Sequence, residues 1–423
     1  MIIAYFFPPA NFVGGDRIAA WAKYLHKLGY FPTIVTRNWN DGQKDLTGRI
    51  EDNTLKHDVF ETYEVYRLPY KRTLRDKLNS YPNSIIASFL RRFLSFLELF
   101  IQNFSMLAIP YANFYDFSLD LIKQGDYKCL IASGRPFQLF SIASKLKKRT
   151  GIPWIADYRD EWNTFQNKNN DSFLLSMIHN LEAKSELSWT SNADLFITVS
   201  ESWKENIQKV IRKNGFVVMN GFDTKPSSAS AVLSNDFGKL EISYIGTLYS
   251  YQPIEFFIQS MKELILRSKN GIKIKVNFIG LNIMPEQEQR VSNLIKGFED
   301  YFFLYDRMPK IEMQQFYENA DFLLATSFDE IKGWYPVKIF EYAASGKPIL
   351  LCPSDNDVLA NFVKETNTGV SFNKTSELID FLSKVILKKT KNEMFELKLN
   401  LNSLETYSRE NQTKKLALIL DKF

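Results

Sequence analysis

The sequence predicts an α/β fold of two domains built on parallel sheets, and three observations carry this prediction. One is a strand–loop–helix–strand unit between Ala320 and Cys352. Another is a similar strand–helix–strand unit over residues 2–36, at the start of the chain. The last is the length of 423 residues, for which two domains are the default expectation. Strands that alternate with helices in this way form parallel sheets with right-handed crossovers.

The unit from Ala320 to Cys352 can be assigned in detail. Residues 322–325 and 349–352 are short apolar runs typical of buried strands, and a polar loop follows the first of them. Pro336 is expected to start the intervening helix, because its fixed φ and missing N–H are tolerated there. Gly346 is expected to end that helix.

The start of this helix has features of a ligand site. Val337, Lys338 and Ile339 are expected to present free backbone N–H groups, and such a helix start stabilises an anion. Glu341, one turn further along, can accept hydrogen bonds from a ligand hydroxyl. The alternative is an ordinary structural unit with a solvated glutamate.

The amino-acid sequence of this helix resembles a known signature. Lys338-Ile-Phe-Glu341-Tyr-Ala-Ala-Ser-Gly346-Lys-Pro348 is similar to the nucleotide-sugar signature of retaining glycosyltransferases of family 4, which have the GT-B fold. The resemblance implies two Rossmann-like domains facing each other across a cleft, with a C-terminal helix crossing back to the first domain. It also implies that Glu341 bonds the ribose hydroxyls of the donor, and that residues 337–339 receive its diphosphate.

A glycine pair near the N-terminus supports the same resemblance. Gly14 and Gly15 follow Pro8-Pro9 and are expected to lie in a loop before a helix capped by Asp16. Glycine lets backbone N–H groups approach a phosphate without a Cβ in the way, although a plain turn is the alternative. The pair resembles the Gly-Gly loop that opens family 4 enzymes, so Gly14 and Gly15 are candidates for donor binding.

Charged side chains follow an expected strand at residues 153–156. Asp157, Arg159 and Asp160 come directly after it, and such a position indicates the edge of a site in an α/β sheet. The alternative is an Arg159–Asp160 ion pair that holds a loop. Many members of the resembled family have a catalytic histidine in place of Arg159, so that role does not carry over. The three residues remain catalytic candidates on the acceptor side.

The second domain is expected to begin with a strand that ends at Gly246 and Thr247, both candidates for donor binding. Family members usually place Arg and Lys after this strand to hold the diphosphate, whereas this chain has Thr247 and residues 249–252. Neutralising charge is therefore expected from elsewhere. Three cations are candidates: Lys338, Arg307 and Lys310.

A second glutamate of the family signature is missing. It usually precedes the position of Glu341 with seven residues between them, and Gly333 occupies that place. Counting from the end of the preceding strand, Glu330 reproduces the usual Ser-x-x-Glu step if the loop is three residues longer. Glu330 is therefore a catalytic candidate, and a plain surface glutamate is the alternative.

The domain boundaries follow from composition and from the resemblance. Residues 1–223 are predicted to form the first, acceptor-side domain, completed by about residues 405–423. Residues 224–240 are rich in Pro, Ser and Asn and are predicted to be a linker. Residues 241–404 are predicted to form the second, donor-binding domain.

Residues 84–107 predict an unusual helix. Its polar residues fall at spacings of three and four on one narrow face: Ser88, Arg91, Ser95, Glu98, Gln102 and Ser105. The rest is apolar and rich in Phe. So wide an apolar face indicates either a core helix or partial burial in a lipid interface, which the flanking basic residues would favour.

Composition excludes several classes. A net charge of +5 is too small to indicate nucleic-acid binding unless it is clustered. The two cysteines and three scattered histidines form no disulfide framework or metal motif, so metal-independent chemistry in a reducing compartment is expected. No basic segment precedes the first apolar run, and no run of about 18 uncharged apolar residues occurs, so a cytoplasmic protein, or one peripheral on the inner membrane, is expected.

These observations favour a retaining glycosyltransferase that needs no cofactor. It would take a UDP- or GDP-linked sugar and pass it to a glycan or a lipid-linked acceptor, in surface polysaccharide or glycoconjugate synthesis. Two alternatives share the fold: a sugar-nucleotide epimerase and a non-catalytic sugar-binding protein.

Overall fold

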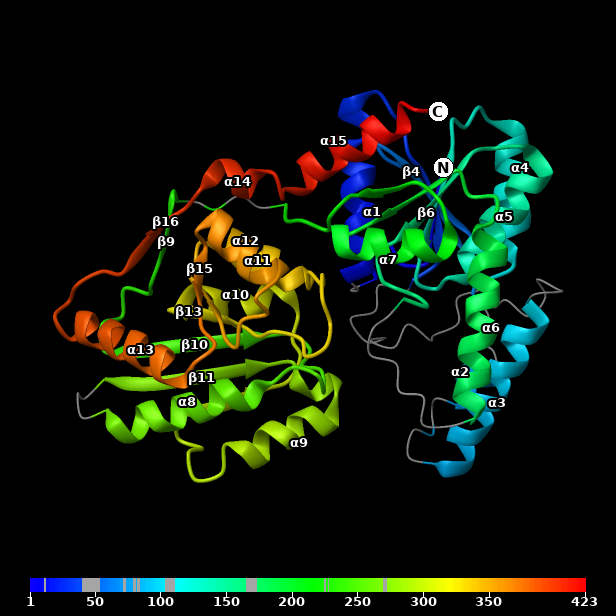
Figure 1. Ribbon diagram of the computed structural model, residues 1–423. Helices are drawn as coiled ribbons and strands as arrows, with labels where there is room; N and C mark the ends of the chain where they lie inside the picture. The colour runs from blue at the N-terminus through cyan, green and yellow to red at the C-terminus, as the bar shows by residue number, and fades with distance from the viewer. Residues whose placement is uncertain are drawn as a thin grey trace. The chain divides into compact units, whose positions relative to one another are not determined.

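The computed structural model of the chain describes residues 1–10, 13–39, 54–70, 74–78, 81, 84–102, 111–164, 173–223, 226, 228–268 and 272–423. The chain divides into two compact units (Figure 1). The first comprises Met1–Asn220 together with Arg409–Phe423, and the second comprises Gly221–Ser408. Each unit is a layered α/β structure and is described by itself.

The sheet of the first unit has the strand order β3-β4-β2-β1-β5-β6-β7-β8 among the described residues. The strands pair in parallel, except that β3 runs antiparallel to β4. Their bounds are β1 Ile2–Ala4, β2 Thr33–Arg37, β3 Lys56–Val59, β4 Glu64–Leu68, β5 Leu130–Gly134, β6 Trp154–Tyr158, β7 Leu195–Thr198 and β8 Gly215–Val217.

The helices of this unit are α1 Val13–Tyr24, η1 His26–Leu28, α2 Leu74–Leu78, α3 Ile85–Gln102, α4 Asn113–Gln124, α5 Gln138–Thr150, α6 Phe173–Thr190, α7 Glu201–Ile211 and α15 Arg409–Leu420. The C-terminal helix α15 belongs to this unit, where Leu416 and Leu420 share an apolar core with Ile18 and Trp21 of α1. The predicted return of the last helix to the first unit is therefore confirmed.

Two expectations for this unit need correction. Helix α1 begins at Val13, so Gly14 and Gly15 lie in its first turn rather than in a loop before it, and Asp16 is not its cap. Helix α3 covers Ile85–Gln102, and residues 103–107 of the predicted helix lie outside the described part of the chain.

The second unit holds a parallel sheet of order β12-β11-β10-β13-β14-β15. An antiparallel pair, β16 with β9, lies beside it. The strand bounds are β9 Ser230–Val232, β10 Lys239–Ile245, β11 Lys273–Ile279, β12 Phe302–Tyr305, β13 Phe322–Ala325, β14 Ile349–Leu351, β15 Gly369–Ser371 and β16 Glu396–Lys398. Residues 224–240, predicted to be a linker, thus contain β9, because its backbone pairs with a distant strand that local composition does not reveal.

The helices of this unit are α8 Ile254–Arg267, η3 Leu281–Ile283, α9 Pro285–Leu294, α10 Lys310–Asn319, α11 Val337–Ala344, α12 Val358–Thr366, α13 Thr375–Thr390 and α14 Leu401–Glu405. The predicted unit at 320–352 is confirmed: β13 and β14 pair in parallel, and α11 connects them. Pro336 is the N-cap of α11, and Gly346 beyond its end has φ +73. That left-handed conformation favours glycine.

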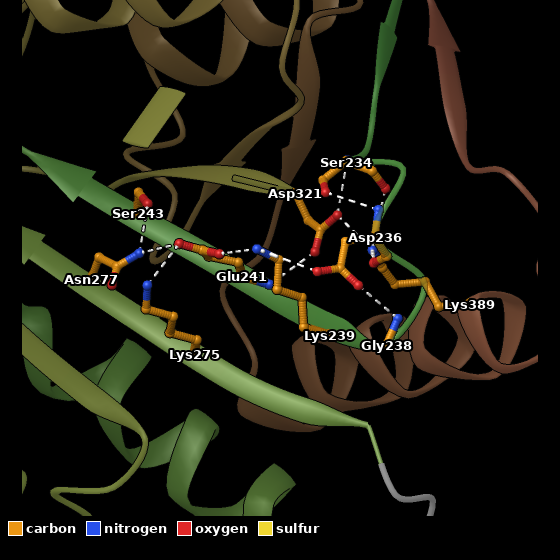
Figure 2. Close-up of polar contacts among 10 residues, drawn as sticks. All are labelled: Ser234, Asp236, Gly238, Lys239, Glu241, Ser243, Lys275, Asn277, Asp321 and Lys389. Atoms are coloured by element: carbon orange, nitrogen blue, oxygen red, sulfur yellow. Dashed lines mark hydrogen bonds and ion pairs between the residues drawn. The ribbon is translucent and has the colours of Figure 1, made fainter. Parts of the chain in front are cut away.

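Buried charges close the amino end of this sheet (Figure 2). Glu241 of β10 accepts hydrogen bonds from Asn277 at 2.7 Å and pairs with Lys239 at 2.7 Å and Lys275 at 3.3 Å. Burial by itself raises the pKa of Glu241, but these partners outweigh it and the pKa is lowered. The network is therefore a paired, hydrogen-bonded structural element at the end of the sheet where ligands do not normally bind.

Both sheets have a point where the strand order reverses. In the first unit it lies between β1 and β5, and in the second between β10 and β13. Connections from neighbouring strands leave in opposite directions at such a point and open a crevice at the carboxyl ends, where ligands of α/β proteins bind. The carboxyl ends of β10 and β13, and of β1, β5 and β6, are therefore the places to look for a site.

Candidate functional site

The crevice of the second unit begins at the carboxyl ends of β10 and β11. Gly246 and Gly280 follow these strands with φ +111 and φ +91, conformations that L side chains rarely adopt. A Cβ placed on Gly280 would lie only 3.8 Å from the Gly246 backbone. The two glycine turns therefore lie against each other, and because neither residue has a Cβ, a ligand can approach their backbones closely.

Lys338 reaches into this crevice from the first turn of α11. Its Nζ lies 3.7 Å from the centre of the Tyr244 ring and 3.5 Å from the carbonyl oxygen of Thr247. A Cβ on Gly246 would be 3.8 Å from the same nitrogen. The fold thus brings together three residues predicted to bind the donor: Gly246, Thr247 and Lys338.

The charge of Lys338 is poorly compensated. Burial lowers the pKa of its ammonium group from 10.5 to about 7, although the nearby Glu341 carboxylate acts to raise it. A single long contact with a carbonyl and one ring face leave most of its hydrogen-bonding capacity unused. An anion bound beside Gly246 would supply the missing partner.

Tyr342 holds the start of α11 in place. Its buried hydroxyl accepts a hydrogen bond from the Ile245 amide at 2.8 Å and donates to the Ile245 carbonyl at 3.2 Å. The helix has no side-chain cap, and the amide of Ile339 donates within the first turn, to Pro336. Of the three amides predicted to be free, that of Ile339 is therefore already engaged, which leaves Val337 and Lys338 as the amides to consider.

Glu341 lies one turn further along α11 and is only partly exposed. Its carboxylate acts to raise the pKa of Lys338. The pKa of the Tyr317 phenol is raised mainly by burial, next by Tyr342, and to a smaller extent by the Glu341 carboxylate. It therefore lies close to the crevice, among groups that a hydroxyl-bearing ligand would meet.

The loop between β13 and α11 explains the missing glutamate. Gly333 has φ +74, and its amide donates to Asp357 at 2.7 Å, so a glutamate there would strain the backbone. Glu330 is exposed and itself has φ +62. A non-glycine residue in that region costs about 1–3 kcal/mol and is often found at functional sites. The conformation makes Glu330 noteworthy without assigning it a role.

Four aromatic residues gather on the two loops at the strand reversal. Tyr249 and Tyr251 follow β10 and stack with ring centres 5.4 Å apart, while Phe328 and Trp334 follow β13 and stack at 4.4 Å. Tyr251 contacts both of the latter rings. The amide of Asp329 donates to the Tyr251 carbonyl at 2.7 Å and ties the loops together. Sequence reasoning missed this cluster, although aromatic residues in two loops that follow strands were a visible signal.

The other two cation candidates are placed differently. Arg307 follows β12, the edge strand, and β11 separates that strand from β10. Its backbone amide donates a hydrogen bond to the side-chain oxygen of Asn282 at 3.0 Å. Lys310 begins α10, but its side chain lies outside the described part of the structure. Lys338 is therefore the predicted cation that the described structure places beside Gly246.

In the first unit, Asp157 is a fully buried anchor. One carboxylate oxygen pairs with Arg17 of α1 at 3.0 Å, and the other accepts from Ser133 of β5 at 2.8 Å. Arg17 also donates to the Val218 carbonyl at 2.5 Å. Asp157 of β6 thus connects α1 to β5, and Arg17 extends this connection to the carbonyl of Val218, which follows β8. The signal for Arg17 was an arginine inside an apolar helix segment, which needs a buried partner.

Arg159 lies against the glycine pair. Its Nε donates to the Gly134 carbonyl at 2.5 Å and its Nη2 to the Arg135 carbonyl at 2.9 Å. A Cβ on Gly14 would fall 1.2 Å from its Nη1, so Gly14 is required to make room for this guanidinium. Burial lowers the pKa of Arg159, partly offset by Asp160.

The alternative of an Arg159–Asp160 ion pair receives little support as the element that holds the loop. The two charged groups are 4.0 Å apart, whereas the two carbonyl contacts of Arg159 are much shorter. The Asp160 side chain is 39% exposed. The structure thus brings Gly14, Arg159 and Asp160 to the carboxyl ends of β1 and β6, with Asp157 beneath them.

Within the described residues, no three or more His, Cys, Asp or Glu side chains come together as metal ligands would. No helix in the described ranges is long and apolar enough to cross a membrane.

A comparison with known protein families finds a match within the second unit. Residues 239–387 match the model of a family described as Glycosyl transferases group 1. No curated protein matches the chain.

Solved structures match along the whole chain. Sucrose-phosphate synthase from Thermosynechococcus elongatus has a TM-score of 0.64 at 13% identity, covering 100% of this chain and 98% of that one. A glycosyltransferase from Rickettsia africae has a TM-score of 0.59 at 12% identity, covering 100% and 97%. Anabaena HepE in complex with UDP-glucose has a TM-score of 0.58 at 13% identity, covering 100% and 99%. The predicted α/β class is confirmed: the chain has the GT-B fold.

Proposed function

We propose that this protein transfers a sugar from a nucleotide-sugar donor to an acceptor, with retention of configuration at the anomeric carbon. One observation carries the proposal: Lys338, a partly buried and poorly compensated cation, lies beside the glycine turn of Gly246 at the strand reversal of a domain that matches the group 1 glycosyltransferase model. That arrangement suits the diphosphate of a nucleotide sugar. The match to the group 1 family and the resemblance to family 4 support it.

The chemistry requires charge to build up on the departing diphosphate as the bond to the sugar breaks. In the proposed mechanism Lys338 and the amides of Val337 and Lys338 stabilise that charge, since preorganised donors in a partly buried site act most strongly where charge develops. The Glu341 carboxylate accepts hydrogen bonds from the ribose hydroxyls. Thr247 and Gly246 border the phosphates, and no metal ion is required.

The acceptor would be handled by the first unit. Arg159 and Asp160 are the proposed contacts with its reacting end, and Asp157 acts as a positioning residue because both of its oxygens are taken by Arg17 and Ser133. Gly14 contributes by admitting the Arg159 guanidinium. Glu330 is the proposed replacement for the missing signature glutamate, a role that its exposed carboxylate leaves accessible.

A glycan or a lipid-linked sugar is the proposed acceptor, in the synthesis of surface polysaccharide or glycoconjugates on the inner face of the membrane. UDP- and GDP-linked sugars are the proposed donors. UDP-glucose is the first probe to use, since a protein of the same fold has been seen with it. The aromatic faces of Tyr249 and Trp334 would suit the apolar side of a sugar ring.

The deciding experiment compares transfer with its two alternatives. The full chain is incubated with UDP- and GDP-sugars, with and without a mixture of glycan and lipid-linked acceptors, and product is followed by mass spectrometry. Acceptor-dependent release of the nucleotide diphosphate supports transfer. Release of an altered nucleotide sugar without acceptor indicates an epimerase, and binding without turnover indicates a sugar-binding protein.

Lys338→Met is the variant that links turnover to the observed site, and Lys347→Met is its control. Burial also lowers the pKa of Lys347, but that lysine lies beyond the end of α11 and near Asp321. Transfer should fall sharply in Lys338→Met and persist in Lys347→Met. Equal activity in both variants would remove Lys338 from the proposed mechanism.

A further inference from the structure

Helix α3 presents an apolar face to solvent. Eight of its 18 residues are large apolar side chains with exposed fractions from 37% to 87%. They are Ile85, Ile86, Phe89, Leu90, Phe93, Leu97, Phe100 and Ile101. At 3.6 residues per turn they occupy one continuous arc of roughly 160°. Monomeric proteins rarely leave so continuous an apolar surface uncovered.

The polar face of the same helix points into the protein. Ser88, Arg91, Ser95, Glu98 and Gln102 line a pocket of about 410 Å³ together with residues of α2, α5 and α6. Glu98 pairs there with Arg75 at 3.1 Å. Helices α3 and α6 run side by side (Figure 1), so the polar stripe is covered by a neighbouring helix.

This arrangement is the reverse of an ordinary surface helix, which turns its polar side to water. The sequence left open whether the wide apolar face is core or lipid-facing. The structure excludes the core alternative for the described part, because Phe89, Phe93 and Phe100 are each about half exposed or more. The face therefore needs a partner that is itself apolar.

Charge indicates which partner. The α3 helix contains one carboxylate, Glu98, and it is turned inward to Arg75. Among the described side chains of α2 and α3, the exposed charges are the cations Lys77 and Arg92. At 3.6 residues per turn Arg92 borders the apolar arc of α3, and it also lines the rim of the pocket. Anionic lipid head groups attract such cations, at about 1 kcal/mol each near a membrane surface. An apolar face with a cation at its border is typical of a helix that lies in the interface rather than across it.

We propose that the outward face of α3 lies in the interface of an anionic lipid bilayer and attaches the first unit to the membrane surface. The apolar side chains enter the boundary between head groups and acyl chains, while Lys77 and Arg92 meet the phosphates. The polar stripe and its pocket stay on the protein side. Because no described helix can span a membrane, the attachment is peripheral.

Vesicle co-sedimentation tests this proposal. The full chain is mixed with phosphatidylglycerol vesicles at low salt and with neutral phosphatidylcholine vesicles. The wild type should bind the anionic vesicles, and high salt should release part of the bound protein. Phe93→Ser with Phe100→Ser should lower the binding constant by about tenfold or more, since two large apolar side chains no longer enter the interface.

The matched control is Leu266→Ser with Ile311→Ser, which also removes two exposed apolar side chains but from the second unit. It should bind vesicles like the wild type. Thermal melts of both double variants should stay close to that of the wild type, because none of the four side chains is buried.

A second measurement reports on the helix itself. Phe93→Cys can be labelled with an environment-sensitive fluorophore, since Cys129 and Cys352 are both buried. The emission should shift to the blue on anionic vesicles, and the same label at Leu266→Cys should not respond.

Three results would overturn the proposal. They are a wild type that ignores anionic vesicles at low salt, a double variant at Phe93 and Phe100 that unfolds, and a wild-type dimer that this variant converts to a monomer. The last would show that the face pairs two copies of the chain. Vesicle binding is independent of sugar transfer, so the two proposals can fail separately.

Discussion

Two lysines at opposite ends of the same sheet, Lys389 fully buried and Lys338 partly buried, differ in what surrounds their ammonium groups. Lys389 is 1% exposed and reaches Asp321 at 2.7 Å, the Asp236 carbonyl at 2.8 Å and the Ser234 carbonyl at 3.4 Å (Figure 2). Lys338 has a 3.5 Å contact with the Thr247 carbonyl and the face of Tyr244. The first ammonium group has its three acceptors, and the second does not.

The difference distinguishes a charge with a structural role from the charge that we propose to bind the donor. A buried charge that is fully paired contributes to the folded state only through those pairs, and its partner suffers if it is removed. A buried charge with weak partners lowers the stability of the folded protein, and an anion that binds beside it restores part of that stability. The ammonium group at the amino end of the sheet thus has its hydrogen-bond acceptors, whereas the one at the carboxyl end has few.

The largest expected effect is on the closed end. Lys389→Met leaves Asp321 buried without its cation, which should lower the free energy of unfolding by about 3–5 kcal/mol. Urea denaturation followed by circular dichroism measures it. Adding Asp321→Asn to Lys389→Met should recover part of the loss, and a single variant as stable as the wild type would contradict the structural role.

A smaller effect is expected at the open end. Glu341→Ala should weaken UDP-sugar binding by about 1.5–3 kcal/mol, the worth of a charge-assisted hydrogen bond to a hydroxyl. Isothermal titration calorimetry measures the affinity, and the melting temperature should hardly change because Glu341 is not fully buried. Glu377→Ala, which removes an exposed carboxylate from the first turn of α13, is the control. Unchanged affinity in a folded Glu341→Ala protein would exclude the assignment.

The pKa of Lys338 predicts a pH dependence. Below its pKa of about 7 the lysine is already charged, so affinity for UDP-glucose should be flat. Above it, binding must take up a proton, and affinity should fall by up to about tenfold per pH unit, or 1.4 kcal/mol. The phosphates of UDP-glucose do not titrate in this range, so they do not contribute to the slope.

The free energy of unfolding should change with pH in the opposite direction to the donor affinity, so the two pH dependences can be distinguished. The pKa of Lys338 is lower in the folded protein than its ordinary 10.5, so between these values the unfolded chain binds more protons and stability rises with pH. Weaker binding at pH 8–9 therefore would not reflect unfolding. Lys338→Met should bind weakly at every pH, and a persisting pH slope in that variant would assign the titration to another group.

The smallest expected effect is that of a chelator. If helix amides and Lys338 neutralise the diphosphate, transfer should continue in EDTA at close to its full rate. Complete loss of activity that Mn²⁺ or Mg²⁺ restores would show that a metal carries the charge instead.

Local patterns were sufficient for most elements of the fold. The apolar runs at 322–325 and 349–352, with Pro336 before the helix and Gly346 after it, predicted a parallel strand–helix–strand unit that the structure confirms. Strand and helix periods, caps and turn residues act within a few residues of each other, so a single sequence contains them. The start of α1 escaped this reasoning because two glycines favour a loop locally, whereas in the fold they lie inside the helix, where Gly14 faces Arg159 and Gly15 faces the backbone of Phe7.

The partners of charges were decided by the tertiary structure alone. The sequence left Lys338, Arg307 and Lys310 as equal candidates, and the order of the strands placed Lys338 beside Gly246. It likewise showed the polar stripe of α3 but not the direction in which that stripe points. Periodicity specifies which residues share a face, whereas burial depends on what packs against that face, and here α6 covers the polar side and leaves the apolar side open.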